Sequence, residues 1–184
     1  REGKSVSTLR AQLTQHGEVQ SHAVAILGAT RPGRAALAWN DLTAPESPRW
    51  QEVPVLPNVA VEFSRQFEYR IVEGIPLVGN TTRAIGWIRA RDPGPDRGAP
   101  YIAALIDAWW PTLFNRFTEM RPMATIAFTL DILGELTGLD PDAPLLYRAT
   151  APVCAEGYFV ESRELWGEDG RLVAINHQTF VVIQ

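Results

Sequence analysis

Two stretches of the chain largely alternate between apolar residues and small or polar ones, running from Glu62 to Val72 and from Ala124 to Ile132. In the second stretch, one set of alternate positions is apolar: Ile126, Phe128, Leu130 and Ile132. The other set is small or polar: Thr125, Ala127, Thr129 and Asp131. Because successive side chains of a strand point to opposite faces of a sheet, the pattern predicts two strands, each with one buried face.

The segment between these strands has a different period. Residues 83–91 are predicted to form another strand, which the breaker Asp92-Pro93-Gly94-Pro95 ends. Pro100 suits the first turn of a helix. Apolar side chains then fall almost all round the helix axis: Ile102, Leu105, Ile106, Trp109 and Leu113, extended by Ala103, Trp110 and Phe114. A helix this apolar is predicted to be buried, and Pro111 to kink or restart it.

Several antiparallel strands are predicted after this helix, at residues 145–150 and in a hairpin over residues 156–178. The order is strand, strand, buried helix, then strands. One apolar helix with a long curved sheet wrapped around it satisfies that order. We therefore predict an α+β chain with the hotdog fold, an antiparallel β-sheet around a central helix. The alternative is an unrelated antiparallel β protein in which the helix only caps a sheet.

The hairpin over residues 156–178 has a counterpart over residues 2–25. Glu2-Gly3 matches Glu156-Gly157, and His16-Gly17-Glu18-Val19 matches Asp169-Gly170-Arg171-Leu172. Each copy is predicted to be a strand, a turn and a strand. The identities are few, so chance similarity is the alternative. Only Arg1 precedes the first copy, whereas about a hundred residues lead into the second from Pro57.

We therefore expect a double hotdog whose first unit is incomplete. Residues 1–43 would be the C-terminal hairpin of the first unit, and residues 58–184 would form the complete second unit. Residues 44–57 contain Pro45, Pro48, Pro54 and Pro57, and are predicted to be an extended linker.

Composition narrows the class of protein. The chain has 184 residues, of which 46% are hydrophobic and 21% charged, as in globular proteins. It has one cysteine, a net charge of −4 and no basic run, which argues against a disulfide framework and against nucleic acid as a partner. No apolar run reaches the roughly 20 residues that span a membrane, and the first residues lack a signal-peptide core. These features predict a cytoplasmic protein with no membrane partner.

Asp107 interrupts the predicted helix, on the side that carries Ala103, Trp110 and Phe114. Burying a carboxylate costs several kcal/mol unless it is paired, and burial raises the pKa of a carboxyl group toward values that suit acid–base catalysis. The alternative is a shorter helix, from which Asp107 meets water near Pro111. The pattern leaves both open.

The other polar positions are weak signals by themselves. Thr125 is ordinary in a strand, and a glutamine such as Gln178 commonly sits at a sheet edge. His16, His22 and His177 have no spacing that would make a metal site. There is also no Gly-x-Ser-x-Gly motif, so neither a metal nor a serine nucleophile is indicated.

Three stretches, however, resemble the acyl-CoA thioesterase II family, the TesB-like double-hotdog enzymes. They are Ala104-Leu105-Ile106-Asp107, Met123-Ala124-Thr125-Ile126, and Asp169-Gly170-Arg171-Leu172-Val173-Ala174 leading to Gln178. Such enzymes carry an aspartate on the central helix, a threonine or serine on the next strand and a glutamine on the last strand. The resemblance implies Asp107, Thr125 and Gln178 as the catalytic residues, with Thr129 as a second candidate threonine. It covers residues 57–184, and residues 1–30 as the end of a first hotdog.

The resemblance also implies a reaction. The chain would hydrolyse the thioester of fatty acyl-CoA to free acid and CoA by direct attack of water, without a cofactor or metal. Asp107 would act as general base or orienting acceptor, Gln178 would orient the water, and Thr125 would add a hydroxyl group. The acyl chain would lie beside Trp109, Trp110 and Phe128. A homodimer of double units is expected.

Two other functions remain open. One is a non-catalytic hotdog protein that binds acyl-CoA or another acyl ligand. The other is a hotdog enoyl-CoA hydratase or dehydratase, a chemistry that usually needs an Asp/His pair at the helix. No histidine lies between His22 and His177.

Overall fold

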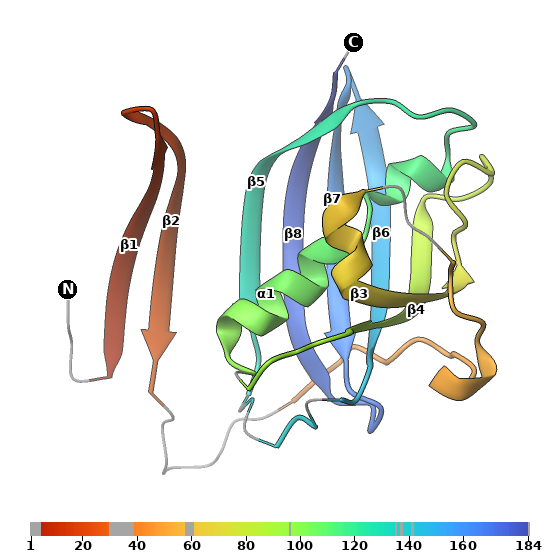
Figure 1. Cartoon of the computed structure of the whole chain (residues 1–184), viewed down its shortest axis with the longest axis horizontal. Helices are drawn as coiled ribbons and strands as arrows, with labels where there is room; N and C mark the ends of the chain where they lie inside the picture. The colour runs from red at the N-terminus through yellow and green to blue at the C-terminus, as the bar shows by residue number, and fades with distance from the viewer. Residues whose placement is uncertain are drawn as a thin grey trace. The chain divides into compact units, whose positions relative to one another are not determined.

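The computed structural model of the protein describes residues 5–29, 39–57, 61–95, 97–134, 136, 138–140 and 142–183. The chain divides into two compact units, Arg1–Asp41 and Leu42–Gln184. The first unit contains an antiparallel hairpin of β1 (Val6–Gln15) and β2 (Glu18–Gly28) (Figure 1). Its turn residues, His16 and Gly17, have φ of 53° and 82°, as a two-residue hairpin turn of type I′ requires. The matching residues Glu2-Gly3 lie outside the described part of the chain.

The second unit is built on one antiparallel sheet with the strand order β3-β4-β6-β7-β8-β5. Its strands are β3 (Phe67–Glu73), β4 (Arg83–Ala90), β5 (Met123–Ile132), β6 (Leu145–Ala155), β7 (Tyr158–Trp166) and β8 (Leu172–Val182). The helix α1 (Ala99–Ala108) connects β4, near one edge, to β5, at the other edge. It therefore has to cross the face of the sheet, as Figure 1 shows. The predicted α+β architecture, a long antiparallel sheet around one helix, is confirmed.

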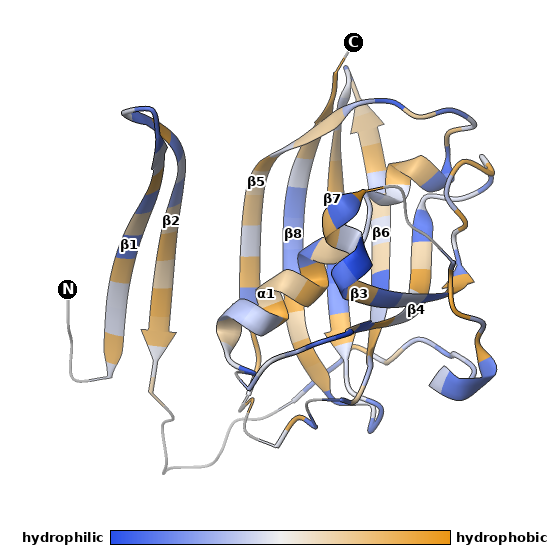
Figure 2. Cartoon of the chain, viewed as in Figure 1, coloured by the Kyte–Doolittle hydropathy of each residue, from blue (hydrophilic) through white to orange (hydrophobic). Residues whose placement is uncertain are grey.

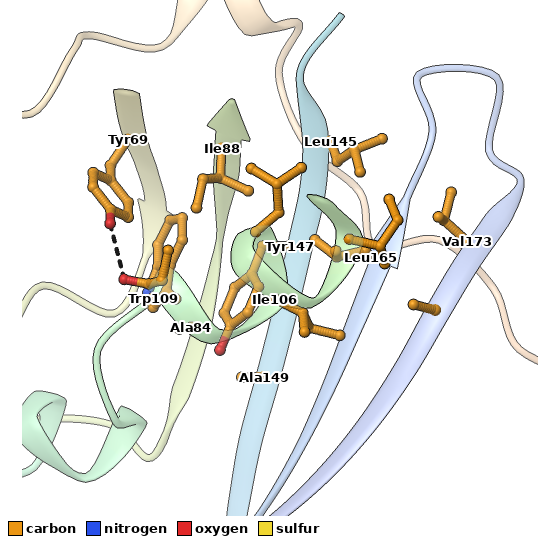
Figure 3. Close-up of a cluster of buried hydrophobic side chains, with 14 residues drawn as sticks. Tyr69, Ala84, Ile88, Ile106, Trp109, Leu145, Tyr147, Ala149, Leu165 and Val173 are labelled. Atoms are coloured by element: carbon orange, nitrogen blue, oxygen red, sulfur yellow. Dashed lines mark hydrogen bonds between the residues drawn. The ribbon is translucent and has the colours of Figure 1, made fainter. Parts of the chain in front are cut away.

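The core lies between α1 and the inner face of the sheet. Ile102, Leu105 and Ile106 of the helix are fully buried, as predicted. Trp109, just after the helix, stacks on Tyr147 of β6 with ring centroids 4.6 Å apart. The hydroxyl group of Tyr69 donates a hydrogen bond of 2.8 Å to the carbonyl oxygen of Ala108 (Figure 3). Each large apolar side chain buried here contributes roughly 1.5–3 kcal/mol, so the apolar stripe anchors the helix.

Residues 42–57 pack on the outer face of the same sheet. Trp50, in the short 3-10 helix η1 (Trp50–Glu52), lies against the guanidinium groups of Arg70 and Arg89, 4.1 and 5.0 Å from its ring. The indole nitrogen of Trp87 donates to the carbonyl oxygen of Pro48 at 3.0 Å. The Pro-rich segment is therefore part of the packed second unit, and it covers the outer face of β3 and β4.

One predicted strand begins later than expected. The strand expected from Glu62 begins only at Phe67, because residues 62–66 form the 3-10 helix η2 (Glu62–Gln66). The predicted break at Pro111 is confirmed: α1 ends at Ala108, and the 3-10 helix η3 (Thr112–Asn115) begins after the proline. Among the residues described, no helix is both long enough and apolar enough to span a membrane.

Candidate active site

Asp107 lies in the last turn of α1, and it is one of the residues that line a pocket. Its side chain is 58% exposed, so of the two alternatives left open by the pattern, a buried carboxylate and a shorter helix, the structure has the second. The reason is the length of the helix. The chain leaves the helical path at Trp109, whose φ and ψ are −72° and 139°, so Asp107 meets solvent from the helix end, as the alternative of a shorter helix expects.

Gln178 projects from the inner face of β8 and is only 1% exposed. Asn176, His177 and Gln178 are successive hydrophilic residues of this strand, and Figure 2 shows a hydrophilic band in the middle of β8. The side-chain nitrogen Nε2 of Gln178 donates to Oδ1 of Asp107 at 3.1 Å, and its oxygen Oε1 accepts from Oγ1 of Thr125 at 3.4 Å. The structure thus brings the three predicted residues together in one hydrogen-bonded cluster.

Thr125 reaches this cluster because of a β-bulge. In the register of β5 with β8, Thr125 pairs with Phe180 and Ala127 pairs with Thr179, so Ile126 is an extra residue. Strict alternation would place Thr125 and Phe128 on opposite faces, but Phe128 pairs with Gln178, on the inner face. The bulge turns Thr125 to that same face. Thr129 pairs with the exposed His177, so it lies on the outer face, away from Gln178.

The orientation of the Gln178 amide follows from its neighbour Asn176, which sequence reasoning missed. Nδ2 of Asn176 donates to the carbonyl oxygen of Thr129 at 2.8 Å, and a carbonyl can only accept. Oδ1 of Asn176 is therefore the end that accepts a hydrogen bond from Nε2 of Gln178, at 2.9 Å. This leaves Oε1 of Gln178 directed to Thr125.

A second missed feature is a buried ion pair on β7. Arg163 is 1% exposed and Glu161 is fully buried; Nε of Arg163 donates to Oε1 of Glu161 at 2.8 Å. Nη1 of Arg163 lies 3.8 Å from Oδ1 of Asp107. The sequence holds a signal for it, because both residues occupy inward positions of a strand whose other inward residues are Phe159 and Leu165.

Burial by itself lowers the pKa of Arg163, but the neighbouring Tyr147, Glu161 and Asp107 outweigh this, and the pKa is raised. Arg163 is therefore a permanent cation beside Asp107. Burial also raises the pKa of Tyr147 well above its ordinary value, so this phenol stays neutral near pH 7.

The pocket next to Asp107 has a volume of about 580 Å³ and a mostly apolar wall. Its aromatic lining includes Phe63, Trp109, Trp110, Phe114 and Phe180. Phe128, which was expected beside the acyl chain, is not among the lining residues. The pocket therefore joins a polar cluster to an apolar space.

A family model described as the acyl-CoA thioesterase C-terminal domain matches residues 40–182. The chain belongs to this family. Membership makes the protein a thioester hydrolase, and it agrees with the resemblance seen in the sequence. Comparison with curated protein sequences gives no match.

Solved structures share the fold of this thioesterase. A protein of unknown function with a hotdog fold from Alicyclobacillus acidocaldarius superposes with a TM-score of 0.87 at 23% identity. A putative thioesterase II from Thermobifida fusca gives 0.79 at 18% identity. The acyl-CoA thioesterase II TesB2 from Mycobacterium marinum gives 0.74 at 23% identity. Each match covers all of this chain and 70% of the other chain, and at these identities the likeness shows the fold alone.

Other chemistries find little support in the thioesterase site. His177 points to the outer face, opposite to Gln178, and His16 and His22 belong to the hairpin unit. Within the described ranges, no group of three or more His, Cys, Asp or Glu side chains is placed to hold a metal ion. The polar cluster of Asp107, Gln178 and Thr125 offers a carboxylate, an amide and a hydroxyl group.

Proposed function

We propose that the protein hydrolyses fatty acyl-CoA to free acid and CoA, using one water molecule held by Asp107, Gln178 and Thr125. The observation that supports this most directly is the hydrogen-bonded cluster of these residues, two of which, Asp107 and Thr125, line an apolar pocket. A fatty acyl chain needs an apolar space, and its thioester needs a polar group that activates water.

In this proposal Asp107 is the general base. Gln178 occupies Oδ1, and no described residue donates a hydrogen bond to Oδ2, so Oδ2 can take a proton from the water. The water oxygen then attacks the thioester carbonyl carbon. When the carbon–sulfur bond breaks, the proton passes from Asp107 to the sulfur of CoA, and the acid leaves. No acyl-enzyme is required, because the described cluster contains no activated serine or cysteine.

Gln178 orients the water, and Thr125 helps to hold the Gln178 amide. Both N–H groups of Gln178 are engaged, by Asp107 and Asn176, whereas Oε1 accepts, from the residues that the structure describes, only the long bond from Thr125. Oε1 has a second lone pair with which it can accept a hydrogen bond from the water. The amide thus holds both the base and the nucleophile.

The homodimer expected from the sequence stays a prediction.

The test is a thioesterase assay with a panel of acyl-CoAs and a free-thiol reagent. We expect Asp107→Asn and Gln178→Ala each to lower kcat by about a hundredfold or more, the usual contribution of general acid–base catalysis. Asp131→Asn is the matched control, because Asp131 is an exposed aspartate of β5 outside the cluster, and this variant should hydrolyse at the native rate. Unchanged rates in both site variants would contradict the mechanism. Tight acyl-CoA binding with no thiol release by the native protein would favour a binding function instead.

A further inference from the structure

The buried pair Arg163–Glu161 has no part in the hydrogen-bond cluster of the proposed site, yet it lies against it. Both charges are removed from water on the inner face of β7. Such a pair is costly to bury and often adds nothing to stability compared with apolar residues of the same size. A contribution to stability therefore does not explain the pair, and the groups that it contacts indicate its role.

Arg163 holds the end of the helix that carries Asp107. Its Nη1 donates to the carbonyl oxygens of Ile106 at 3.0 Å and of Trp109 at 3.3 Å. The last carbonyls of a helix have no partner within the helix, and the last turn of α1 has no basic residue of its own. Asp107 lies between the two carbonyls that Arg163 binds. The guanidinium group therefore fixes the backbone on both sides of Asp107.

The same cation offsets an unfavourable position of Asp107. The C-terminal end of a helix carries partial negative charge, which disfavours a carboxylate. Arg163, 3.8 Å from Oδ1, supplies positive charge at this end. The other ionisable groups around Asp107 are Glu161 on β7, Tyr147 on β6 and Arg121, which lines the same pocket; Gln178 on β8 is neutral.

Glu161 orients Arg163 and holds the next segment. One oxygen, Oε1, accepts from Nε of Arg163, and the other, Oε2, accepts from the backbone N–H of Thr112 at 2.9 Å. Together, Arg163 and Glu161 hold both ends of the Trp109–Pro111 connection, which forms one wall of the pocket.

We propose that Arg163, oriented by Glu161, is a positioning residue of the thioesterase: it fixes the backbone on both sides of Asp107, and so directs the Asp107 carboxylate toward Gln178. The inference rests on the proposed role of Asp107 as the base. Loss of the pair should therefore impair the chemical step more than substrate binding.

The first test uses the double variant Glu161→Gln/Arg163→Met, which removes both charges with little change in volume and leaves neither charge unpaired. We expect kcat to fall about tenfold to a hundredfold, as misplacement of a catalytic group by about 1 Å does, with KM changed by less than about threefold. Arg163→Lys should also lower kcat, because an ammonium group keeps the charge but cannot reproduce the fork of contacts.

The matched control is Arg148→Met, which breaks an Arg–Glu pair with Glu164 on the outer face of the same sheet. It should change neither kcat nor KM. A folded double variant with native kcat would overturn the proposal. If the double variant does not fold, Arg163→Lys serves as the test instead. A native kcat in Arg163→Lys would also overturn the proposal.

A second readout separates this inference from the proposed function. The side-chain amide of Gln178 can be followed by NMR in ¹⁵N-labelled protein without substrate, and assigned with Gln178→Ala. Because this amide donates to Asp107, its resonance should shift between the native protein and the double variant, even if the chain hydrolysed no acyl-CoA. An unchanged resonance would overturn the role of Arg163, whereas absent turnover with a shifted resonance would count only against the proposed function.

Discussion

Thr125 and Thr129 lie four positions apart on β5, and the structure assigns them to opposite faces of the sheet. Thr125 donates a hydrogen bond to Gln178, whereas Thr129 contributes its backbone carbonyl to Asn176 and points its side chain outward. We expect Thr125→Val, which removes the hydroxyl group at nearly constant volume, to lower kcat about tenfold, the equivalent of roughly 1.4 kcal/mol. Thr129→Val is the matched control and should change kcat by less than about twofold. Equal losses measured in the two variants would contradict the assignment.

The residues of the site were accessible to sequence reasoning to different degrees. Asp107, Thr125 and Gln178 could be named from local motifs, because each lies in a short stretch that resembles one family. The exposure of Asp107 could not be predicted from a motif, because it depends on where α1 ends. Asn176 and Arg163 were missed because their importance lies in contacts with Gln178 and Ile106, which are visible only when the strands are placed against the helix.

At the level of elements, the contact between β4 and Trp109 is unusually close. A Cβ atom at Gly86 would lie 2.4 Å from the carbonyl oxygen of Arg70 and 2.5 Å from the ring of Trp109. We therefore expect Gly86→Ala to lower the free energy of unfolding by about 1–3 kcal/mol, the usual cost of overpacking, and to reduce activity by moving a wall of the pocket. Urea unfolding followed by fluorescence measures the first effect.

Gly28→Ala is a suitable comparison for this variant. A Cβ atom at Gly28 would meet nothing within 4 Å, and its φ is not in the left-handed region. The substitution should leave the stability within about 1 kcal/mol of the native value or raise it slightly. Native stability in Gly86→Ala would show that β4 and Trp109 can separate without loss.

Element boundaries were predicted well where the hydrophobic period was unambiguous and less well where packing decides. Pro100 and the apolar stripe located α1, and the alternation located β5. The alternation from Glu62, in contrast, continued the pattern of a strand through residues that form η2. It also suggested that Glu68 faces solvent, whereas Glu68 is buried. The alternation predicts only that one face of the strand is apolar. It does not predict that residues 42–57 cover the other face of the sheet.

At the scale of the whole molecule, the family model covers residues 40–182, which is almost all of the second unit. The hairpin of the first unit lies outside this match. Like the hairpin of β7 and β8, it consists of two antiparallel strands. The repeat aligns Ala25 of β2 with Gln178, so the first hairpin has no glutamine at this position. That residues 1–43 are the end of a first hotdog stays a prediction, and the proposed chemistry belongs to the second unit.

The outer face of the second unit should make its stability depend on pH. Glu68 is buried and accepts hydrogen bonds from Arg70 and Arg89, the two residues that hold Trp50. Burial by itself raises the pKa of Glu68, but the hydrogen bonds and charges of Arg70 and Arg89 outweigh it, and the pKa is lowered. A carboxyl group with a lowered pKa in the folded state binds protons more readily when the chain unfolds. Its stabilisation is therefore complete above the ordinary pKa of a glutamate and is lost as the pH falls through the lowered value.

We expect Glu68→Gln to lower the free energy of unfolding by about 2 kcal/mol at pH 7, the scale of hydrogen bonds to a charged group. The difference from the native protein should shrink in acid, because protonation of Glu68 removes the same charge. Urea unfolding at a series of pH values measures both curves. Glu119→Gln, in the exposed pair with Arg121, should leave the native curve unchanged, since exposed ion pairs contribute little. A loss in Glu68→Gln that is as large in acid as at pH 7 would show that Glu68 acts by packing, and that the charges of Arg70 and Arg89 do not hold residues 42–57 against the sheet.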